Sequence, residues 1–310
     1  MAGLFWNPRG IGEDIKKNFI RNAISEYNLY FICIQETKKS SFSAVNFHKL
    51  SGRGVFSWII VPSVGIGGGM LLGVNNLFLD IVESEVGVFF IKVVVHDKKS
   101  GVRWNLVNIY GAPHNRDKEN FLVELVHIFQ NRNGLPLVVG GDFNLIRSMD
   151  ECNKDLALNK WSRLFNAIIE NWEIKELEMP GRRYTWSNNH VEPTLKKLDR
   201  ILFSLAWEQL FPLVSLKVLA REMSDHAPLI VNLGLNTQKI VRPFKFELCL
   251  FLREDLVNVV SKVWADSYRG KSIADKWQNR GRKLRKVLKG WNLNYVWLYK
   301  KQKKGTFCCY

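Results

Sequence analysis

The stretch VVGGDFN, residues 138–144, is an apolar strand that runs through two glycines into an acid, an aromatic residue and an amide. The apolar part is typical of a strand that is buried in a sheet, whereas Asp142 and Asn144 are polar and need partners when they are buried. Because the polar residues come at the end of the strand, the pattern indicates chemistry at a sheet edge. The rest of the chain must supply the other groups.

Further segments also carry polar residues at a strand end. They are FWNPRG with Asn7, CIQET with Glu36, NIYGAP with Tyr110, KLDRILFS with Asp199, and MSDHAP with Asp225 and His226. Taken singly, each has a structural explanation, since Asn and Asp commonly begin turns, Glu is usually solvated and Tyr is often half-buried packing. Their joint order along the chain is the stronger signal.

The first 234 residues alternate short apolar strands with a few helices. Apolar residues at helical spacing predict helices over residues 13–27, 121–130 and 161–172, and runs of short strands lie between and after them. Strand runs with helices inserted between hairpins predict an α+β body of four layers, in which two packed sheets are flanked by helices. The strand pattern ends near residue 235, which divides the chain into a body, 1–234, and a tail, 235–310.

Composition limits the class of protein. The chain has 310 residues and 46% hydrophobic content, enough for one large core or two modest ones. No apolar run reaches the roughly 20 residues that cross a bilayer, and the N-terminus has no secretory signal pattern, so we expect no membrane partner and an intracellular location. The five cysteines are spread widely without paired spacing, which indicates reduced thiols.

The net charge of +16 is concentrated in the tail. Residues 1–234 carry 27 Lys and Arg against 24 Asp and Glu, a net +3, and residues 235–310 carry 18 against 5, a net +13. From residue 276 onward, apolar residues such as Leu284, Leu288 and Trp291 recur at helical spacing among Lys and Arg. This predicts a basic helical extension that lies on nucleic acid or docks on a neighbouring domain.

The motif series WNPRG, QET, NIYGAP, GDFN, LDRILFS and SDHAP resembles that of the endonuclease/exonuclease/phosphatase superfamily, whose members resemble DNase I and the apurinic endonucleases. The series spans residues 5–228. Within the superfamily, GRRYTWSNN leading into KLDRILFS, then SDHAPL and RPFKFE, is most similar to the endonuclease domain of plant non-LTR (LINE-type) retrotransposons. The resemblance implies a β-sandwich of two mixed sheets flanked by helices, with the active site at one edge.

The resemblance also implies hydrolysis of a phosphodiester, which requires an activated water and a cation beside the nonbridging oxygens. Carboxylate and amide oxygens suit Mg²⁺, with Mn²⁺ as an alternative. We expect Glu36 as the first metal ligand, with Asn7 beside it and Asp225 as a further candidate. Asp142 would deprotonate the attacking water, and Asn144 would hold water and phosphate. His226 would bind phosphate or transfer a proton, supported by Asp199 or Asp225, and Tyr110 would contact the scissile phosphate.

Substrate contacts are expected in the region 182–197, which resembles the hairpin that reads DNA shape in the retrotransposon enzymes. The candidates there are Arg182, Arg183, Thr185, Lys196 and Lys197, with Ser224 beside the SDHAP motif; a solvated loop is the alternative reading. His114 and Arg116, which follow the Tyr110 motif, are candidates to line the groove.

Three functions remain open at this point. The first is an Mg²⁺-dependent DNA endonuclease that nicks one strand and leaves a 3′-hydroxyl, in the nucleus. The second is a phosphatase or phosphodiesterase of the same superfamily that acts on a small substrate, and the third is a non-catalytic nucleic-acid-binding remnant of a retroelement. In the plant retrotransposons that the chain resembles, the tail precedes a reverse transcriptase; none follows here, so we expect a truncated or frame-shifted copy, or a stand-alone fragment. Its tail would bind RNA or a separate reverse transcriptase domain.

Overall fold

The computed structural model describes residues 1–51, 56–65, 67–154, 157–234 and 255–265, together with residues 277, 280, 281, 283, 284, 287 and 288. The chain forms two compact units, Met1–Thr237 and Gln238–Tyr310, and each is described by itself. No helix in the described part of the chain is long and apolar enough to cross a membrane.

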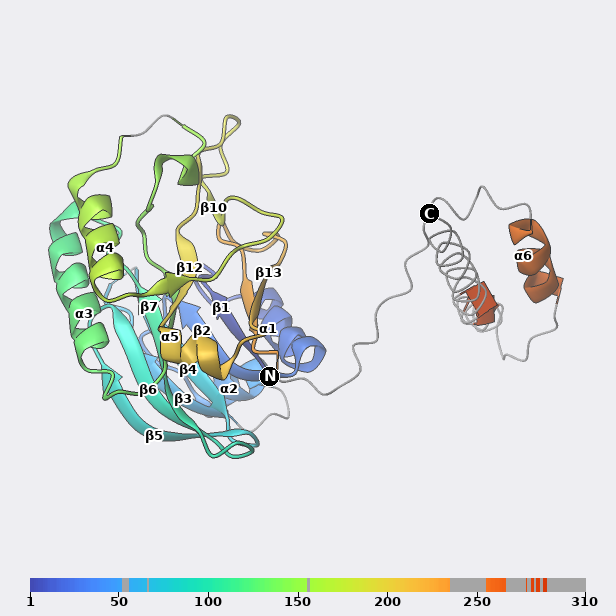
Figure 1. Cartoon of the computed structure of the whole chain (residues 1–310), viewed down its shortest axis with the longest axis horizontal. Coiled ribbons are helices and arrows are strands. Elements are labelled where there is room, and N and C mark those ends of the chain that lie inside the picture. The colour runs from blue at the N-terminus through green and yellow to red at the C-terminus, as the bar shows by residue number, and fades with distance from the viewer. Residues whose placement is uncertain are drawn as a thin grey trace, which may run out of the picture. The chain divides into compact units, whose positions relative to one another are not determined.

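The first unit contains two six-stranded mixed sheets (Figure 1). One sheet has the order β13-β14-β1-β2-β4-β3, and the other has the order β5-β6-β7-β8-β12-β9. The strands of the first sheet are β1 (Ala2–Trp6), β2 (Leu29–Gln35), β3 (Phe56–Val61), β4 (Met70–Asn75), β13 (Ser215–Val218) and β14 (Leu229–Asn232). The strands of the second sheet are β5 (Leu79–Val86), β6 (Phe90–Asp97), β7 (Arg103–Tyr110), β8 (Leu137–Asp142), β9 (Lys175–Glu176) and β12 (Asp199–Phe203).

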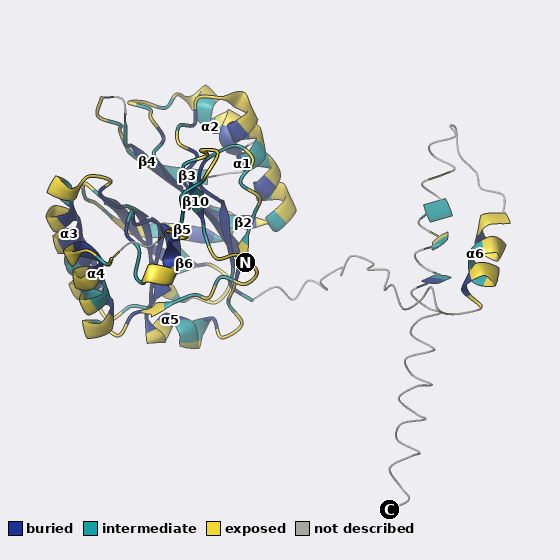
Figure 2. Cartoon of the chain, turned by 90° about the horizontal axis from the view of Figure 1, so that it is seen from above, coloured by how far each residue is buried: buried dark blue, intermediate teal, exposed yellow. Residues whose placement is uncertain are grey.

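Helices cover the outer face of each sheet and make four layers, which confirms the predicted fold class (Figures 1 and 2). Two helices, α1 (Asp14–Tyr27) and α2 (Ala44–Ser51), lie on the first sheet, and α3 (Lys118–Gln130) and α4 (Lys160–Asn171) lie on the second. The remaining short elements are η1 (Asn115–Asp117), η2 (Met149–Glu151), α5 (Leu205–Leu210) and the small hairpin β10 (Trp186–Ser187) and β11 (Leu195–Lys196).

The core follows from the alternation of side chains along each strand. In β1, Phe5 packs between the two sheets, while Leu4 and Trp6 point to the opposite face and pack beneath α1 and α2. In β8, Val138 packs between the sheets and Val139 packs beneath α3 and α4. Each central strand is therefore buried on both faces, which explains why these strands are apolar along their whole length.

Two parallel strand pairs bring the motif residues to one edge of the sandwich. In the first sheet β1 is parallel to β2, so the segments that follow them, with Asn7 and Glu36, emerge together. In the second sheet β7 is parallel to β8, and Tyr110 stands opposite Asp142. The antiparallel strand β12 places Asp199 opposite Asp142 from the other side.

The second unit includes α6 (Leu256–Ala265). Residues 277, 280, 281, 283, 284, 287 and 288 are helical, in the segment where the sequence predicts a basic helix. Trp264 of α6 meets Trp277 edge to face at a centroid distance of 5.8 Å. The rest of the predicted tail, including Trp291 and the terminal TFCCY, lies outside the described residues.

Candidate active site

The turn after β8 depends on a glycine. Gly141 has φ +135°, and a Cβ atom there would lie 2.1 Å from the carbonyl oxygen of Ile109 on the neighbouring strand. Only glycine tolerates both the conformation and the close approach. Phe143, fully buried among the side chains beneath α3 and α4, anchors the turn on its other side. The acid between them is therefore held in one position.

Asp142 accepts hydrogen bonds from three groups. The backbone N–H of Asn144 donates to Oδ1 at 2.9 Å, and the side-chain amides of Asn7 and Asn144 donate to Oδ2 at 3.0 and 3.2 Å. Asn144, which has φ +52°, also donates from Nδ2 to the carbonyl oxygen of Gly111 at 2.9 Å. The side chain is 1% exposed, and these donors satisfy a carboxylate that burial would otherwise penalise.

His226 lies against Asp142 and is oriented by Asp199. Its Nδ1 is 2.9 Å from Oδ2 of Asp199, and its Nε2 is 3.7 Å from Oδ2 of Asp142. Of the two carboxylates that the sequence left open as the support of His226, the structure places Asp199 on the ring nitrogen. Asp199 is itself held by Thr185, whose Oγ1 accepts the backbone N–H of Asp199 at 3.0 Å.

The pKa values of His226 and Asp142 are both raised above their ordinary values. Burial lowers the pKa of His226, but the carboxylates of Asp199 and Asp142 outweigh this effect and raise the pKa to about 9. Burial raises the pKa of Asp142 to about 6, although His226 opposes the rise. At neutral pH the buried pair is therefore a carboxylate beside an imidazolium. Perturbed groups of this kind, next to a pocket, are typical of a catalytic site.

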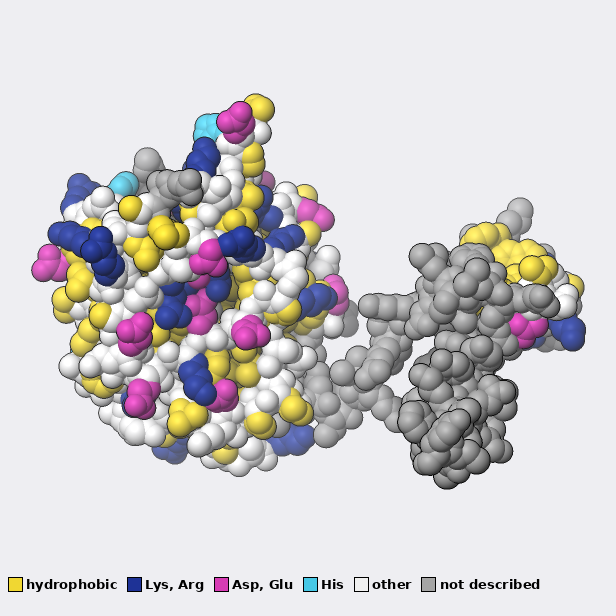
Figure 3. All heavy atoms as spheres, turned by 45° about the horizontal axis from the view of Figure 1, so that its top comes forward, with side chains coloured by type: hydrophobic (Ala, Val, Ile, Leu, Met, Phe, Trp, Pro, Cys, Tyr) yellow, Lys and Arg dark blue, Asp and Glu magenta, His cyan; other side chains and the backbone are white. Residues whose placement is uncertain are grey.

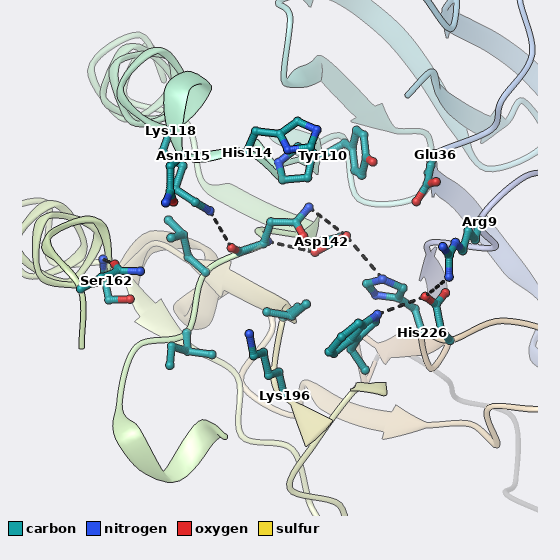
Figure 4. Close-up of a pocket in the computed structure, with 18 of the residues that line it drawn as sticks. Arg9, Glu36, Tyr110, His114, Asn115, Lys118, Asp142, Ser162, Lys196 and His226 are labelled. Carbon is teal, nitrogen blue, oxygen red and sulfur yellow. Dashed lines mark hydrogen bonds and ion pairs between the residues drawn. The ribbon is translucent and has the colours of Figure 1, made fainter. Parts of the chain in front are cut away.

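A pocket of about 760 Å³ opens over this pair (Figure 4). Of the predicted residues, Glu36, Tyr110, Asp142, Asn144, Asp225 and His226 line it, as do His114 and Lys196. Burial, Glu36 and Asp142 together raise the pKa of Tyr110, so its hydroxyl keeps its proton and can donate to an anion. Figure 4 shows Tyr110, Glu36 and His226 around the same opening.

Several predicted residues are near the pocket but do not line it. Asn7 is fully buried and links Glu36 to Asp142 through Nδ2. Thr185 is fully buried beneath Asp199, so its predicted contact with substrate is replaced by support of that acid. Ser224 donates to the carbonyl oxygen of Asn7 at 2.7 Å.

The remaining predicted substrate contacts lie beyond the pocket, toward η2. Lys197 is paired with Glu176 at 2.5 Å. Arg183 is exposed beside Asp150, at 3.6 Å. Arg116, a candidate to line the groove, is exposed and does not line the pocket.

The structure adds residues that the sequence did not mark as part of the site. Trp186 lines the pocket and donates from Nε1 to Oδ2 of Asp225 at 3.1 Å. Arg9 also lines it and contacts the same oxygen at 2.8 Å. Lys118, at the start of α3, donates to the carbonyl oxygens of Ala112 and Asn144, and burial lowers its pKa to about 8. Trp186, Arg9 and Lys118 come together only in the folded chain, so no local sequence pattern predicts that they share a site.

Glu36 suits a hard divalent cation. It has φ +48°, lines the pocket, and its carboxylate accepts from Asn7 at 3.3 Å and pairs with Lys38 at 3.0 Å. Carboxylate oxygens of this kind are what Mg²⁺ prefers. In the described part of the chain, Asp142, Asp199 and His226 also place one ligand atom each within 4.8 Å of one another. Glu36 and this cluster are thus two places in the described part of the pocket where side chains could hold such an ion.

A buried ion network supports the site from below. The guanidinium of Arg200 is fully buried next to Asp199 in the chain and contacts Glu151 at 2.9 Å and Glu176 at 3.1 Å. Burial raises the pKa of Glu176, but Arg200 and Lys197 overcome this and lower it to about 2. The network ties β12 to β9 and η2, and so fixes the strand that carries Asp199.

The chain belongs to the Endonuclease/Exonuclease/phosphatase family, which its sequence matches over residues 3–226. The family resemblance predicted from the motif series is thereby confirmed. Members of this family are hydrolases of phosphate esters and are typically dependent on a divalent metal. No curated protein sequence matches the chain.

Solved structures share the fold at low sequence identity. The endonuclease domain of TRAS1, a telomere-specific non-LTR retrotransposon, has 15% identity and a TM-score of 0.57, with 77% of this chain and 99% of that chain covered. An AP endonuclease from Leishmania major has 15% identity and a TM-score of 0.60, with 74% and 86% covered. A 3′ phosphatase from Neisseria, bound to a product DNA hairpin, has 18% identity and a TM-score of 0.59, with 75% and 98% covered.

Proposed function

We propose that this chain is an Mg²⁺-dependent DNA endonuclease that nicks one strand and leaves a 3′-hydroxyl, as the retrotransposon enzymes do. The observation that carries the proposal is the buried Asp142–His226–Asp199 arrangement beneath a pocket that is also lined by Glu36 and Tyr110. The likeness to the endonuclease domain of a non-LTR retrotransposon and to a phosphatase bound to DNA supports the substrate class.

The residues take complementary roles in the proposed reaction. Asp142, ionised above its pKa of about 6, accepts the proton of the attacking water, and Asn144 orients that water. His226, protonated below about pH 9 and held by Asp199, donates to a phosphate oxygen, as does the Tyr110 hydroxyl. Glu36 would hold Mg²⁺, with Asn7 and Asp225 as further candidates, and the bound ion supplies neutralisation of the nonbridging oxygens.

The tail and the location belong to the same proposal. A net charge of +13 over residues 235–310 favours binding of a polyanion. We therefore propose that the tail binds nucleic acid, which includes RNA. A separate reverse transcriptase domain is the alternative partner. A chromosomal DNA substrate in a nucleated cell would place the chain in the nucleus, which we propose as its location. Retention of a tagged chain in the cytoplasm would contradict that part.

The direct test is nicking of supercoiled plasmid by the full chain, with Mg²⁺ and with a chelator. We expect metal-dependent nicking that Asp142→Asn abolishes, while Asp80→Asn, which removes an exposed acid paired with Lys98 on β5, leaves the rate unchanged. Extension of the nick by a DNA polymerase would verify the 3′-hydroxyl. Binding of DNA without cleavage would support the non-catalytic alternative, and release of phosphate from small substrates without nicking would support the phosphatase.

A further inference from the structure

A second, smaller hollow of about 280 Å³ adjoins the catalytic pocket. The two hollows share Arg9 and Asp225, so they lie on either side of one ion pair. The second hollow is also lined by Lys16 of α1 and by Arg221, Glu222 and Ser224 of the segment before His226. Its walls therefore come from two ends of the first unit that meet at this edge.

The cations of this hollow are not all neutralised by the protein. Arg221 makes no ion pair and no side-chain hydrogen bond with any residue in the described ranges, although it is only partly exposed. Burial and the nearby positive charge of Arg182 lower the pKa of Arg221, while Asp225 opposes the effect. Arg182 is held in place by a bond of 2.8 Å to the carbonyl oxygen of Leu219. An arginine that lies near a second arginine and is engaged in no ion pair within the described ranges favours the binding of an anion.

The acids around the hollow do not occupy all the donors of its cations. Asp225 is buried, and its two oxygens accept from Arg9, Trp186 and Ser224, so it holds Arg9 in position. Arg9 nevertheless remains 60% exposed, with donors free to face an incoming group. Lys16 is paired with Glu13 at 3.2 Å and lines the hollow. Glu222 is the exposed acid on the rim.

We propose that Arg9, Arg221 and Lys16 form a second phosphate-binding subsite, which takes a backbone phosphate close to the one in the catalytic pocket. The proposal rests on the proposed function, because it takes a nucleic-acid strand as the ligand. Arginine suits this role, since its planar donors match the oxygens of a phosphodiester. Arg9 lies at the boundary and sets the spacing between the two phosphates. A small phosphorylated metabolite has no second phosphodiester to offer, so the subsite selects for a polymer.

The test measures binding of a duplex oligonucleotide by fluorescence anisotropy in chelator, where no cleavage occurs. We expect Arg221→Gln to weaken binding several-fold and to reduce the slope of log affinity against log salt by about 1, as loss of one phosphate contact does. Arg221→Lys should keep most of the slope. The matched control is Arg103→Gln, an exposed arginine at the opposite end of the strand from Tyr110.

A discrete subsite also predicts dependence on position. With oligonucleotides that carry one neutral methylphosphonate at successive backbone positions, we expect one position beside the cleavage point to weaken wild-type binding and to have no further effect in Arg221→Gln. An Arg221→Gln effect no larger than that of Arg103→Gln, or equal penalties at every position in both proteins, would overturn the subsite. Because binding is measured without cleavage, a chain that binds in this way but never nicks would refute the proposed catalysis and leave the subsite standing.

Discussion

Asp142 and His226 are buried side by side in opposite charge states. They form an ion pair in which Nε2 of His226 is 3.7 Å from Oδ2 of Asp142, and Asp199 accepts the Nδ1–H on the other side of the ring. Both groups have pKa values above their ordinary ones, about 6 for the acid and about 9 for the imidazole. The pair is thus poised to be ionised across the physiological range.

The pH dependence of nicking follows from these directions. We expect the rate to rise with pH as Asp142 loses its proton near pH 6, and to fall as His226 loses its proton near pH 9. Asp199→Asn removes the carboxylate that contributes most to the raised pKa of His226, so the alkaline limb should move to lower pH. Plasmid nicking from pH 5 to 10 measures this, with Asp80→Asn as control. An unmoved alkaline limb would show that His226 does not set it.

At the residue scale, polar side chains at strand ends were predictable from the sequence. Asp142 and Glu36, at the ends of apolar strands, each have a structural explanation alone, but their order with the other motif residues is informative without a structure. Lys118 and Trp186 were not predictable in this way, because one begins a helix and the other belongs to a two-residue strand. The support that Thr185 gives to Asp199 was not predictable either, because its hydroxyl accepts backbone N–H groups from residues more than ten positions away.

The strand β8 and its turn are the element on which the site depends. We expect Gly141→Ala to lower the free energy of unfolding by about 2 kcal/mol or more, because a methyl group would meet the Ile109 carbonyl at a positive φ. Nicking should fall with it, since Asp142 is the next residue. Urea denaturation measures the stability. Gly12→Ala, whose Cβ would meet nothing within 4 Å, is the matched control and should change stability by less than about 1 kcal/mol.

The ion network beneath β12 gives a second test at this scale. Arg200→Met leaves Glu151 and Glu176 without their shared guanidinium, and the expected loss of stability is about 3–5 kcal/mol. Arg163→Met, which alters an exposed arginine of α4, should cost far less. Equal midpoints of urea unfolding in the two variants would mean that the network contributes nothing to stability.

Elements were predictable from the sequence where their periodicity was strong. The helix α4 was expected because its apolar residues repeat at helical spacing, and Asn159 caps its first turn by accepting the Ser162 N–H. The strand β5 was not expected, because it is an edge strand whose side chains are mostly exposed. The β-rich segment 195–204 forms two strands, because Leu195 and Lys196 pair in the small hairpin while Asp199 pairs with β8.

On the scale of the whole molecule, charge is divided unequally between the two units. If the tail contacts phosphates as proposed, replacing Arg282, Arg285, Lys286 and Lys289 by Gln should reduce the salt slope of DNA binding by up to about 4, and leave the nicking rate at saturating DNA unchanged. Anisotropy and plasmid nicking measure the two quantities. An unchanged salt slope would remove the tail from the nucleic-acid interface.

Figure 3 shows that Lys and Arg side chains on the first unit are interspersed with Asp and Glu. This agrees with the small net charge of residues 1–234, and it means that the first unit does not attract a polyanion through bulk charge alone. If this unit binds nucleic acid as proposed, its affinity comes from individual contacts such as the one proposed for Arg221. The sequence revealed the imbalance between the units, but not where individual charges converge.

Because β1 pairs with β14, the site is complete only after both ends of the first unit have been synthesised. Trp6 donates to the carbonyl oxygen of His226, 220 residues further along the chain, and Ser224 closes onto Asn7. During translation at about 5–20 residues per second, roughly 10 to 45 s separate the synthesis of these two ends. For most of that interval the nascent chain has Asn7 and Glu36 but no His226, so the proposed cleavage of nucleic acid cannot begin before residue 226 has been added.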